Sequence, residues 1–146
     1  MPWIQNVSLA DVRYGDHYSP GENSMLIQIV DPAMEFPVPD YNFKKVYQYE
    51  FLDIESDGIT TLDDGRTIDM GEFAITDDQA RSLVCVLHEA MTANMNVIVH
   101  CVAGVCRSGA VAEVAVMMGF IDAKAYRQPN LLVKHKMMKV LGWTYD

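Results

Sequence analysis

A short apolar strand, a loop containing a glycine and a helix rich in alanine and valine follow one another between residues 97 and 118. The strand, 97–100, carries no acidic, lysine or arginine side chain, so we expect both of its faces to be buried. The helix, 108–118, ends at Gly119. A buried strand that leads through a loop into a helix is typical of a parallel sheet. We therefore expect an α/β fold with a central, mostly parallel sheet and helices on both of its faces.

Hydrophobic periodicity and turn residues predict the other elements of a single domain spanning residues 1–146. Thr76 with Gln79 forms a capping-box pattern at the start of one helix, and Asn130 can cap the last one. The elements are strands at 4–9, 25–30 and 45–52, helices at 77–94 and 131–141, and a hairpin around Asp64-Gly65 inside an elaborated loop, 55–75.

Composition and charge limit the partners and the compartment. The chain has 20 acidic and 11 basic residues, a formal charge of −9 that repels nucleic acid. It has neither a charged-then-apolar leader nor an apolar run of about 20 residues, so no membrane partner is expected. Three cysteines cannot all pair within one chain, which favours free thiols in the cytoplasm. Cys85 is expected in the core, on the apolar face of its helix.

The loop after the apolar strand concentrates the residues that carry chemistry. Cys101 directly follows the strand, and Arg107 stands six residues later at the helix start. The N–H groups of such a loop and the helix dipole favour an anion, so Cys101 is expected to act as a thiolate nucleophile. Gly104 lets the loop turn its amides inward, and the planar fork of Arg107 can hold two phosphate oxygens. Ser108 can donate to the sulfur and make it a better leaving group.

His-Cys, five residues and Arg-Ser, at 100–108, resemble the signature of the protein tyrosine phosphatase superfamily, in particular its compact dual-specificity branch. The resemblance covers about residues 25–141. It implies a phosphatase that uses no metal or cofactor: Cys101 attacks phosphorus, a loop aspartate protonates the leaving oxygen, and water hydrolyses the phosphocysteine. The residues implied to hold the phosphate are Val102, Ala103, Gly104, Val105, Cys106 and Arg107.

Three aspartates compete for the role of general acid. Asp57, in an Asp-Gly pair after the 45–52 strand, is our first choice because several members of the superfamily place an Asp-Gly there. Asp53 is our second choice. It lies at the end of that strand in a position that resembles the aspartate of the aromatic-Pro-Asp motif of the tyrosine-specific branch, although the proline is missing here. Asp69 is third, standing 32 residues before Cys101. At least two of the three are ordinary loop aspartates.

Cys106 lies five residues after Cys101, and its place directly before the arginine resembles the low-molecular-weight phosphatases. One hypothesis is that it captures an oxidised Cys101 as a disulfide, and the alternative is a small apolar residue beneath the loop. The histidines at 17, 88 and 135 have no carboxylate or thiol at ligand spacing, so we predict no metal.

The variable positions of the loop, Val102, Ala103 and Val105, include no basic residue, which argues against highly charged substrates. The predicted substrate is a phosphorylated protein or peptide that carries phosphotyrosine, with phosphoserine and phosphothreonine as further options. Two alternatives remain open: a phosphopeptide-binding module with weak catalysis, and another thiol enzyme with an anion-binding loop, a sulfurtransferase or an arsenate reductase. The sequence does not predict the oligomeric state.

Overall fold

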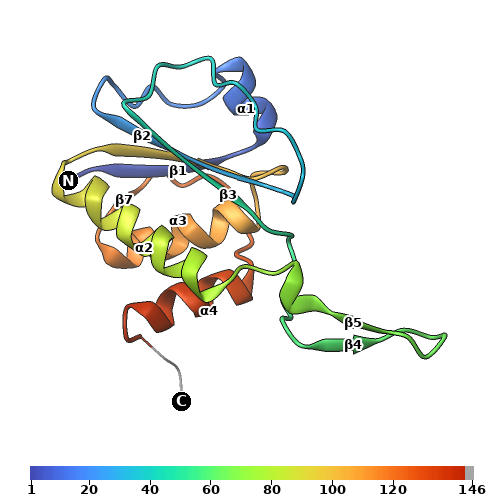
Figure 1. The fold of residues 1–146 in the computed structure, drawn as a ribbon. Coiled ribbons are helices and arrows are strands. Elements are labelled where there is room, and N and C mark those ends of the chain that lie inside the picture. Colours follow the sequence, from blue (N-terminus) through green and yellow to red (C-terminus); the bar gives the residue numbers. More distant parts are fainter. Residues whose placement is uncertain (144–146) are drawn as a thin grey trace.

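A computed structural model describes residues 1–143, so the last three residues of the predicted domain lie outside the described part. Its centre is a sheet of five parallel strands in the order β3-β2-β6-β1-β7 (Figure 1). The strands are β1 (Trp3–Val7), β2 (Ser24–Val30), β3 (Lys45–Glu50), β6 (Asn96–His100) and β7 (Ile121–Asp122). Helices lie on both faces, which confirms the predicted α/β fold.

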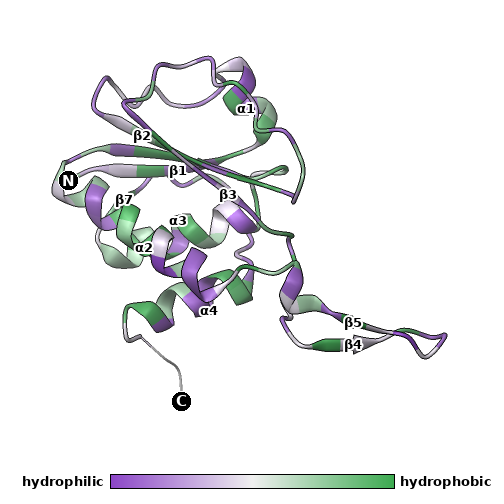
Figure 2. Ribbon diagram, viewed as in Figure 1, coloured by the Kyte–Doolittle hydropathy of each residue, from purple (hydrophilic) through white to green (hydrophobic). Residues whose placement is uncertain are grey.

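β6 occupies the middle of the sheet, between β1 and β2. Ile98 pairs with Gln5 on one side and Leu26 on the other. Val97, Ile98 and Val99 are fully buried, and every residue of β2 is buried as well. Continuous apolar runs are what strands covered on both faces require, and Figure 2 shows hydrophobic residues along these strands.

Three helices cover one face of the sheet and a single short helix covers the other (Figure 1). α2 (Asp77–Thr92), α3 (Arg107–Met118) and α4 (Leu131–Val140) pack on one face and enclose the larger apolar core. On the other face, α1 (Leu9–Tyr14) contributes Val12 to a smaller core with Phe43 and Ile98. α3 begins directly after the loop that follows β6, and Asn130 at the start of α4 donates to the Cys106 carbonyl, so both helices begin near the carboxyl end of β6.

Two of the predicted helix starts are confirmed in detail. The Thr76 side chain accepts from the Gln79 N–H, and the Gln79 side chain accepts from the Thr76 N–H at 2.9 Å, a complete capping box. Asn130 Oδ1 accepts from the Val133 N–H at 3.0 Å and so caps α4.

The N-terminal segment differs from the prediction. The expected strand at 4–9 ends at Val7, because Ser8 and Asp11 form a capping box that starts α1. Gly15, with φ 71°, then ends that helix in the left-handed conformation. Cys85 was expected in the core but is exposed on α2, because the buried face of that helix is formed by its neighbours Leu83, Val84, Val86 and Leu87.

The predicted hairpin is confirmed as β4 (Ile59–Thr61) paired antiparallel with β5 (Thr67–Asp69), followed by the 3-10 helix η1 (Met70–Glu72). It projects away from the sheet and helices (Figure 1), and all three residues of β4 are exposed. Within residues 1–143, none of the helices has the length and apolar character needed to cross a membrane.

Candidate active site

The loop 101–106 lies at the carboxyl end of β6, the central strand, and leads directly into α3. Ligands of open parallel sheets bind at this edge. Cys106 is the N-cap of α3 and its side chain makes no capping hydrogen bond. The first N–H groups of a twelve-residue helix are therefore left for another acceptor.

The carbonyl groups of this loop are turned away from its centre by partners from other segments. Because N–H points opposite to the preceding C=O in a trans peptide, the amides at 103, 105, 106 and 107 face inward, as an anion-binding nest requires. The bonded carbonyls are those of Val102 (Leu9 N–H, 3.2 Å), Gly104 (Asn6 Nδ2, 2.8 Å), Val105 (Gln128 N–H, 3.1 Å) and Cys106 (Asn130 N–H, 2.9 Å).

Gly104 is required by both conformation and space. Its φ is +80°, and a Cβ at this position would lie 2.4 Å from the carbonyl carbon of Val7 and 2.5 Å from the Ser8 nitrogen. Both atoms belong to the backbone at the end of β1, so they cannot move aside as a flexible side chain would. The loop therefore packs against β1 as closely as its backbone allows.

The Cys101 thiol is buried at the base of the loop, with 2% of the residue exposed. Its Sγ accepts from the Gly104 N–H at 3.2 Å and lies 3.2 Å from Ser108 Oγ, a contact in which the hydroxyl can donate. These two donors and the start of α3 surround one sulfur. The atom that the sequence predicts as nucleophile therefore lies within hydrogen-bond distance of two donor groups.

Arg107 is 4% exposed, and its guanidinium is held from one side only. Nη1 donates to Asp31 Oδ1 and to the Phe51 carbonyl oxygen, both at 2.7 Å. Nε has no hydrogen-bond partner among the described residues, although it is buried. A buried N–H without a partner is costly, so this edge of the fork is suited to an anionic ligand.

His100 is fully buried at the end of β6, and its Nδ1 lies 3.1 Å from the Cys101 carbonyl oxygen. Burial lowers the pKa of this imidazole from 6.5 to about 4, against a smaller raising effect of the bond to that carbonyl. The ring is therefore neutral at physiological pH and donates through Nδ1–H, which fixes the carbonyl of the first loop residue.

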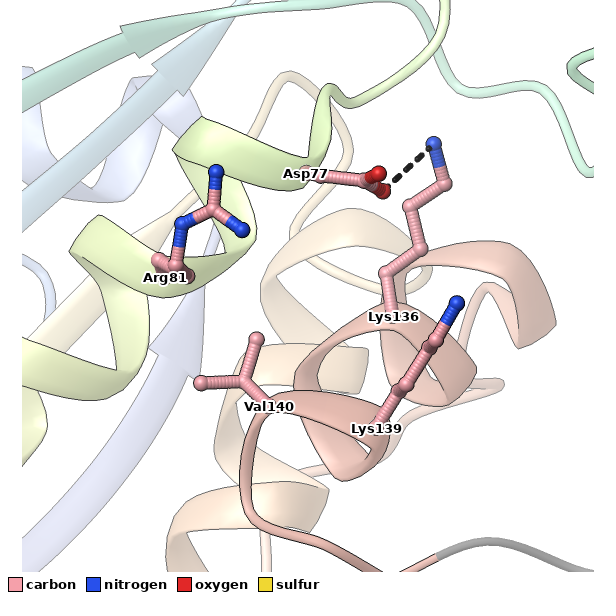
Figure 3. A pocket seen from close by; sticks show the side chains of 5 residues that line it. All are labelled: Asp77, Arg81, Lys136, Lys139 and Val140. Carbon is pink, nitrogen blue, oxygen red and sulfur yellow. Dashed lines mark ion pairs between the residues drawn. The ribbon is translucent and has the colours of Figure 1, made fainter.

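Two of the three candidate aspartates are bound to groups outside the loop. Asp57 Oδ2 lies 3.1 Å from Lys136 Nζ, and the hydrogen bond and charge of that ammonium lower the pKa of Asp57. Figure 3 shows Lys136 extending from α4 towards Asp77 at the start of α2. Asp69 caps η1 by accepting from the Gly71 N–H at 3.0 Å.

Asp53 lies beside the loop. Its Oδ1 accepts from Asn130 Nδ2 at 2.7 Å. Burial, followed by the charge of Asp53 and a hydrogen bond to it, raises the pKa of the half-buried Cys106 thiol. Asp53 is therefore the one of the three candidates whose carboxylate interacts with a residue of the loop itself.

Cys106 is a free thiol like Cys101, and its raised pKa keeps it protonated at neutral pH. A protonated thiol beside a carboxylate is a poor nucleophile. Its suggested capture of an oxidised Cys101 stays a prediction. Wild type and Cys106→Ser treated with peroxide and then reductant would test it, since equal recovery of both would contradict a protective role.

Three residues of the site were not singled out for this role by the sequence. Asp31, to which the sequence assigned no role, accepts a hydrogen bond from Arg107. Asn6 donates to the Gly104 carbonyl, and Asn130 was read only as a helix cap. For Asp31 a signal existed, because the carboxyl ends of neighbouring parallel strands meet at one edge. For Asn6, no pattern in the sequence connects it with a residue 98 positions later.

A pocket of about 340 Å³ lies elsewhere, between α2 and α4 (Figure 3). Its lining includes the basic side chains of Arg81 and Lys139. Lys136, in the same lining, is already bound to Asp57, Asp77 and the Ile75 carbonyl.

Across residues 1–143, no three His, Cys, Asp or Glu side chains gather as metal ligands do.

No protein-family model, no curated protein and no solved structure matches this chain. The functional argument therefore rests on the residues and on the geometry of the loop.

Proposed function

We propose that this protein is a cysteine-dependent phosphatase that hydrolyses phosphate monoesters of proteins through a phosphocysteine, as the resemblance to the protein tyrosine phosphatase superfamily implies. The observation that carries the proposal is the pairing of a buried thiol with an anion-binding loop closed by Arg107. That arginine is held by Asp31 and Phe51 on one edge and keeps a buried, unpartnered Nε on the other.

In the first step, the Cys101 thiolate attacks phosphorus as the ester P–O bond breaks. The inward amides and Arg107 stabilise the charge on the equatorial oxygens, and an aspartic acid transfers its proton to the leaving oxygen. In the second step, water attacks phosphorus, its proton returns to the aspartate and the P–S bond breaks. Ser108, 3.2 Å from the sulfur, donates to the departing thiolate. The products are the dephosphorylated hydroxyl and inorganic phosphate.

We assign the proton transfer to Asp53. Asp53 interacts with Cys106 of the loop, whereas the first choice from sequence, Asp57, is bound to Lys136. The ion pair with Lys136 lowers the pKa of Asp57 and so disfavours the protonated form that a general acid needs. Asp69 is committed to capping η1.

We further propose a phosphotyrosine-containing protein as substrate, with phosphoserine and phosphothreonine as further options, and a cytoplasmic location. Two observations support this. The formal charge of −9 and the absence of basic residues among Val102, Ala103 and Val105 disfavour polyanionic substrates. The three cysteines are free, as in a reducing compartment.

Hydrolysis of p-nitrophenyl phosphate by wild type, Cys101→Ser and Arg107→Lys tests the proposal. We expect wild-type turnover without added metal, none with Cys101→Ser, and a large rise in KM with Arg107→Lys, because an ammonium cannot form the two-point contact. A wild type that binds a phosphotyrosine peptide without hydrolysing it would be a binding module. Turnover of thiosulfate or arsenate without phosphatase activity would indicate the other thiol enzymes.

A further inference from the structure

Asn130 lies where three parts of the site meet: the loop after β6, the segment after β3 and the start of α4. The residue is 1% exposed. Its backbone N–H donates to the Cys106 carbonyl at 2.9 Å, and its Oδ1 accepts from the Val133 N–H at 3.0 Å. Its Nδ2 donates to Asp53 Oδ1 at 2.7 Å and to the Ile54 carbonyl at 3.1 Å. One buried residue thus connects the proposed proton donor, through its side chain, with the loop, through its backbone N–H.

Capping of α4 explains only half of this arrangement. A cap needs one acceptor, which Ser, Thr or Asp would supply as well as Asn. An amide adds two N–H donors to that acceptor, and here both donors are directed at residues 53 and 54. The 2.7 Å bond has a carboxylate as acceptor, which makes it stronger than a neutral hydrogen bond.

Asp53 depends on such a contact because its own segment offers little support. It is exposed and lies outside the strands and helices, between the end of β3 and the projecting hairpin. General acid catalysis requires the carboxyl to stand within hydrogen-bond reach of the leaving oxygen. A group on an exposed segment reaches that position reproducibly only if something buried holds it.

We propose that Asn130 is a positioning residue that holds the Asp53 carboxyl beside the loop for proton transfer. The proposal rests on the function proposed above, with Asp53 as the acid. Because the same residue bonds the Cys106 carbonyl, the acid and the anion-binding loop share one anchor. Asn130 itself touches neither substrate nor reacting atoms.

The test is Asn130→Ser, which keeps a capping oxygen for α4 but loses both donors to residues 53 and 54. Steady-state kinetics are measured on phenyl phosphate, whose leaving oxygen needs the proton, and on p-nitrophenyl phosphate, whose leaving group departs more readily. We expect kcat on phenyl phosphate to fall about 10- to 100-fold, with a much smaller fall on p-nitrophenyl phosphate and an unchanged KM. An equal fall on both substrates would overturn the proposal and leave Asn130 as a cap.

Asn96→Ser is the matched control. Asn96 also uses both ends of its amide, accepting from the Trp3 N–H and donating to the Pro20 carbonyl, but it lies at the opposite end of β6. Asn96→Ser should lower the thermal midpoint of unfolding. It should not change the ratio of kcat on phenyl phosphate to kcat on p-nitrophenyl phosphate. If Asn130→Ser does not fold, Asn130→Asp keeps the cap and the size of the side chain, replaces the donors by an anion, and should give the same selective loss.

A double-mutant cycle separates this inference from the proposed function. With Asp53→Asn as background, Asn130→Ser should cause no further loss on phenyl phosphate, since there is no acid left to position. Losses that simply multiply would overturn the positioning role while leaving the phosphatase proposal intact. Full activity of Cys101→Ser would instead overturn the phosphatase proposal, and the positioning role with it.

Discussion

The two halves of the candidate site are built in opposite ways. The loop 101–106 is held by hydrogen bonds to four of its carbonyls and by contact of Gly104 with β1, and it continues into a buried helix. The segment from Asp53 to the hairpin is mostly exposed, and its contact with the loop depends on side chains such as Asn130, 77 positions away. The half proposed to bind phosphate is therefore preorganised by backbone, whereas the half proposed to donate the proton is held by a few side chains.

Because of this difference, the two halves should tolerate different amino-acid substitutions. A backbone-built anion site needs its glycine and its neighbouring strand but few particular side chains. A side-chain-held acid can be lost through a single substitution that leaves the fold intact. Substitutions in the two halves should accordingly differ in whether they change the fold of the loop or only the rate of catalysis.

The largest effect is expected from the acid. Asp53→Asn should lower kcat on phenyl phosphate by about 10²- to 10⁴-fold, the usual contribution of general acid catalysis, and remove the basic limb of the pH profile. Its stability should stay close to wild type, because the carboxylate is exposed. Asp57→Asn and Asp69→Asn are the matched variants. If either of them shows a loss of that size while Asp53→Asn stays active, the proton transfer belongs to that residue and not to Asp53.

Gly104→Ala tests the backbone-built half. A Cβ there would lie 2.4 Å from the Val7 backbone, so the loop must shift, and kcat/KM should fall about 10²- to 10³-fold on both aryl phosphates. Gly65→Ala is the control, since Gly65 has φ +87° but nothing within 4 Å of a new Cβ. Gly65→Ala should lower the unfolding free energy by about 1 kcal/mol, because alanine disfavours a positive φ, but its Cβ would clash with no other atom. Equal activities of the two variants would contradict the close contact with β1.

His100 gives the buried half a pH dependence of stability. Its folded-state pKa is about 4 and its unfolded value about 6.5, so the unfolded chain binds the extra proton between these pH values. Stability should therefore be complete above pH 6.5 and fall by about 3 kcal/mol as the pH decreases to 4. Urea unfolding across this range measures it. His100→Asn should flatten the slope and the exposed His88→Gln should not. A slope that does not depend on His100 would contradict the burial of this ring at the end of β6.

The smallest effect is expected from the hairpin. Replacing residues 60–68 by a short glycine-serine turn removes strands whose residues are mostly exposed. Activity on p-nitrophenyl phosphate should change by no more than about twofold, the size typical of surface changes. A larger loss would show that the hairpin contributes to the site and that the exposed half is more organised than its contacts indicate.

The parts of the molecule that the sequence could predict are those encoded by neighbouring residues. The β6–loop–α3 unit, the capping box at Thr76 and the Asp64-Gly65 hairpin each depend on contacts within a few positions, and each is present in the structure. The short helix α1 was not predicted, since the expected elements begin with a strand at 4–9 and include no helix before residue 77. Its own Ser8–Asp11 box was the overlooked local evidence.

What the sequence could not predict depends on contacts between distant segments. Periodicity placed Cys85 on the buried face of α2, but where α4 and the sheet pack decides which side of that helix is covered. Spacing likewise could not show that Asp53 contacts Asn130 while Asp57 is bound to Lys136, because both contacts join distant segments. Asp31 meets Arg107 only once β2 and β6 lie side by side.

The central position of β6 also has a consequence for folding. β1 and β2 are both complete by residue 30, but they do not pair with each other, and the strand that joins them begins only at Asn96. Among the described strands β1 pairs with β6 and β7, so it cannot join the sheet during synthesis until more than two thirds of the chain has been made, whereas β2 can pair earlier with β3. Folding is typically slow when a long loop must close before the contacts that stabilise it can form. A nascent chain would therefore carry β1 unpaired for most of its synthesis, which makes early chaperone binding to residues 3–7 an expected feature of its biogenesis.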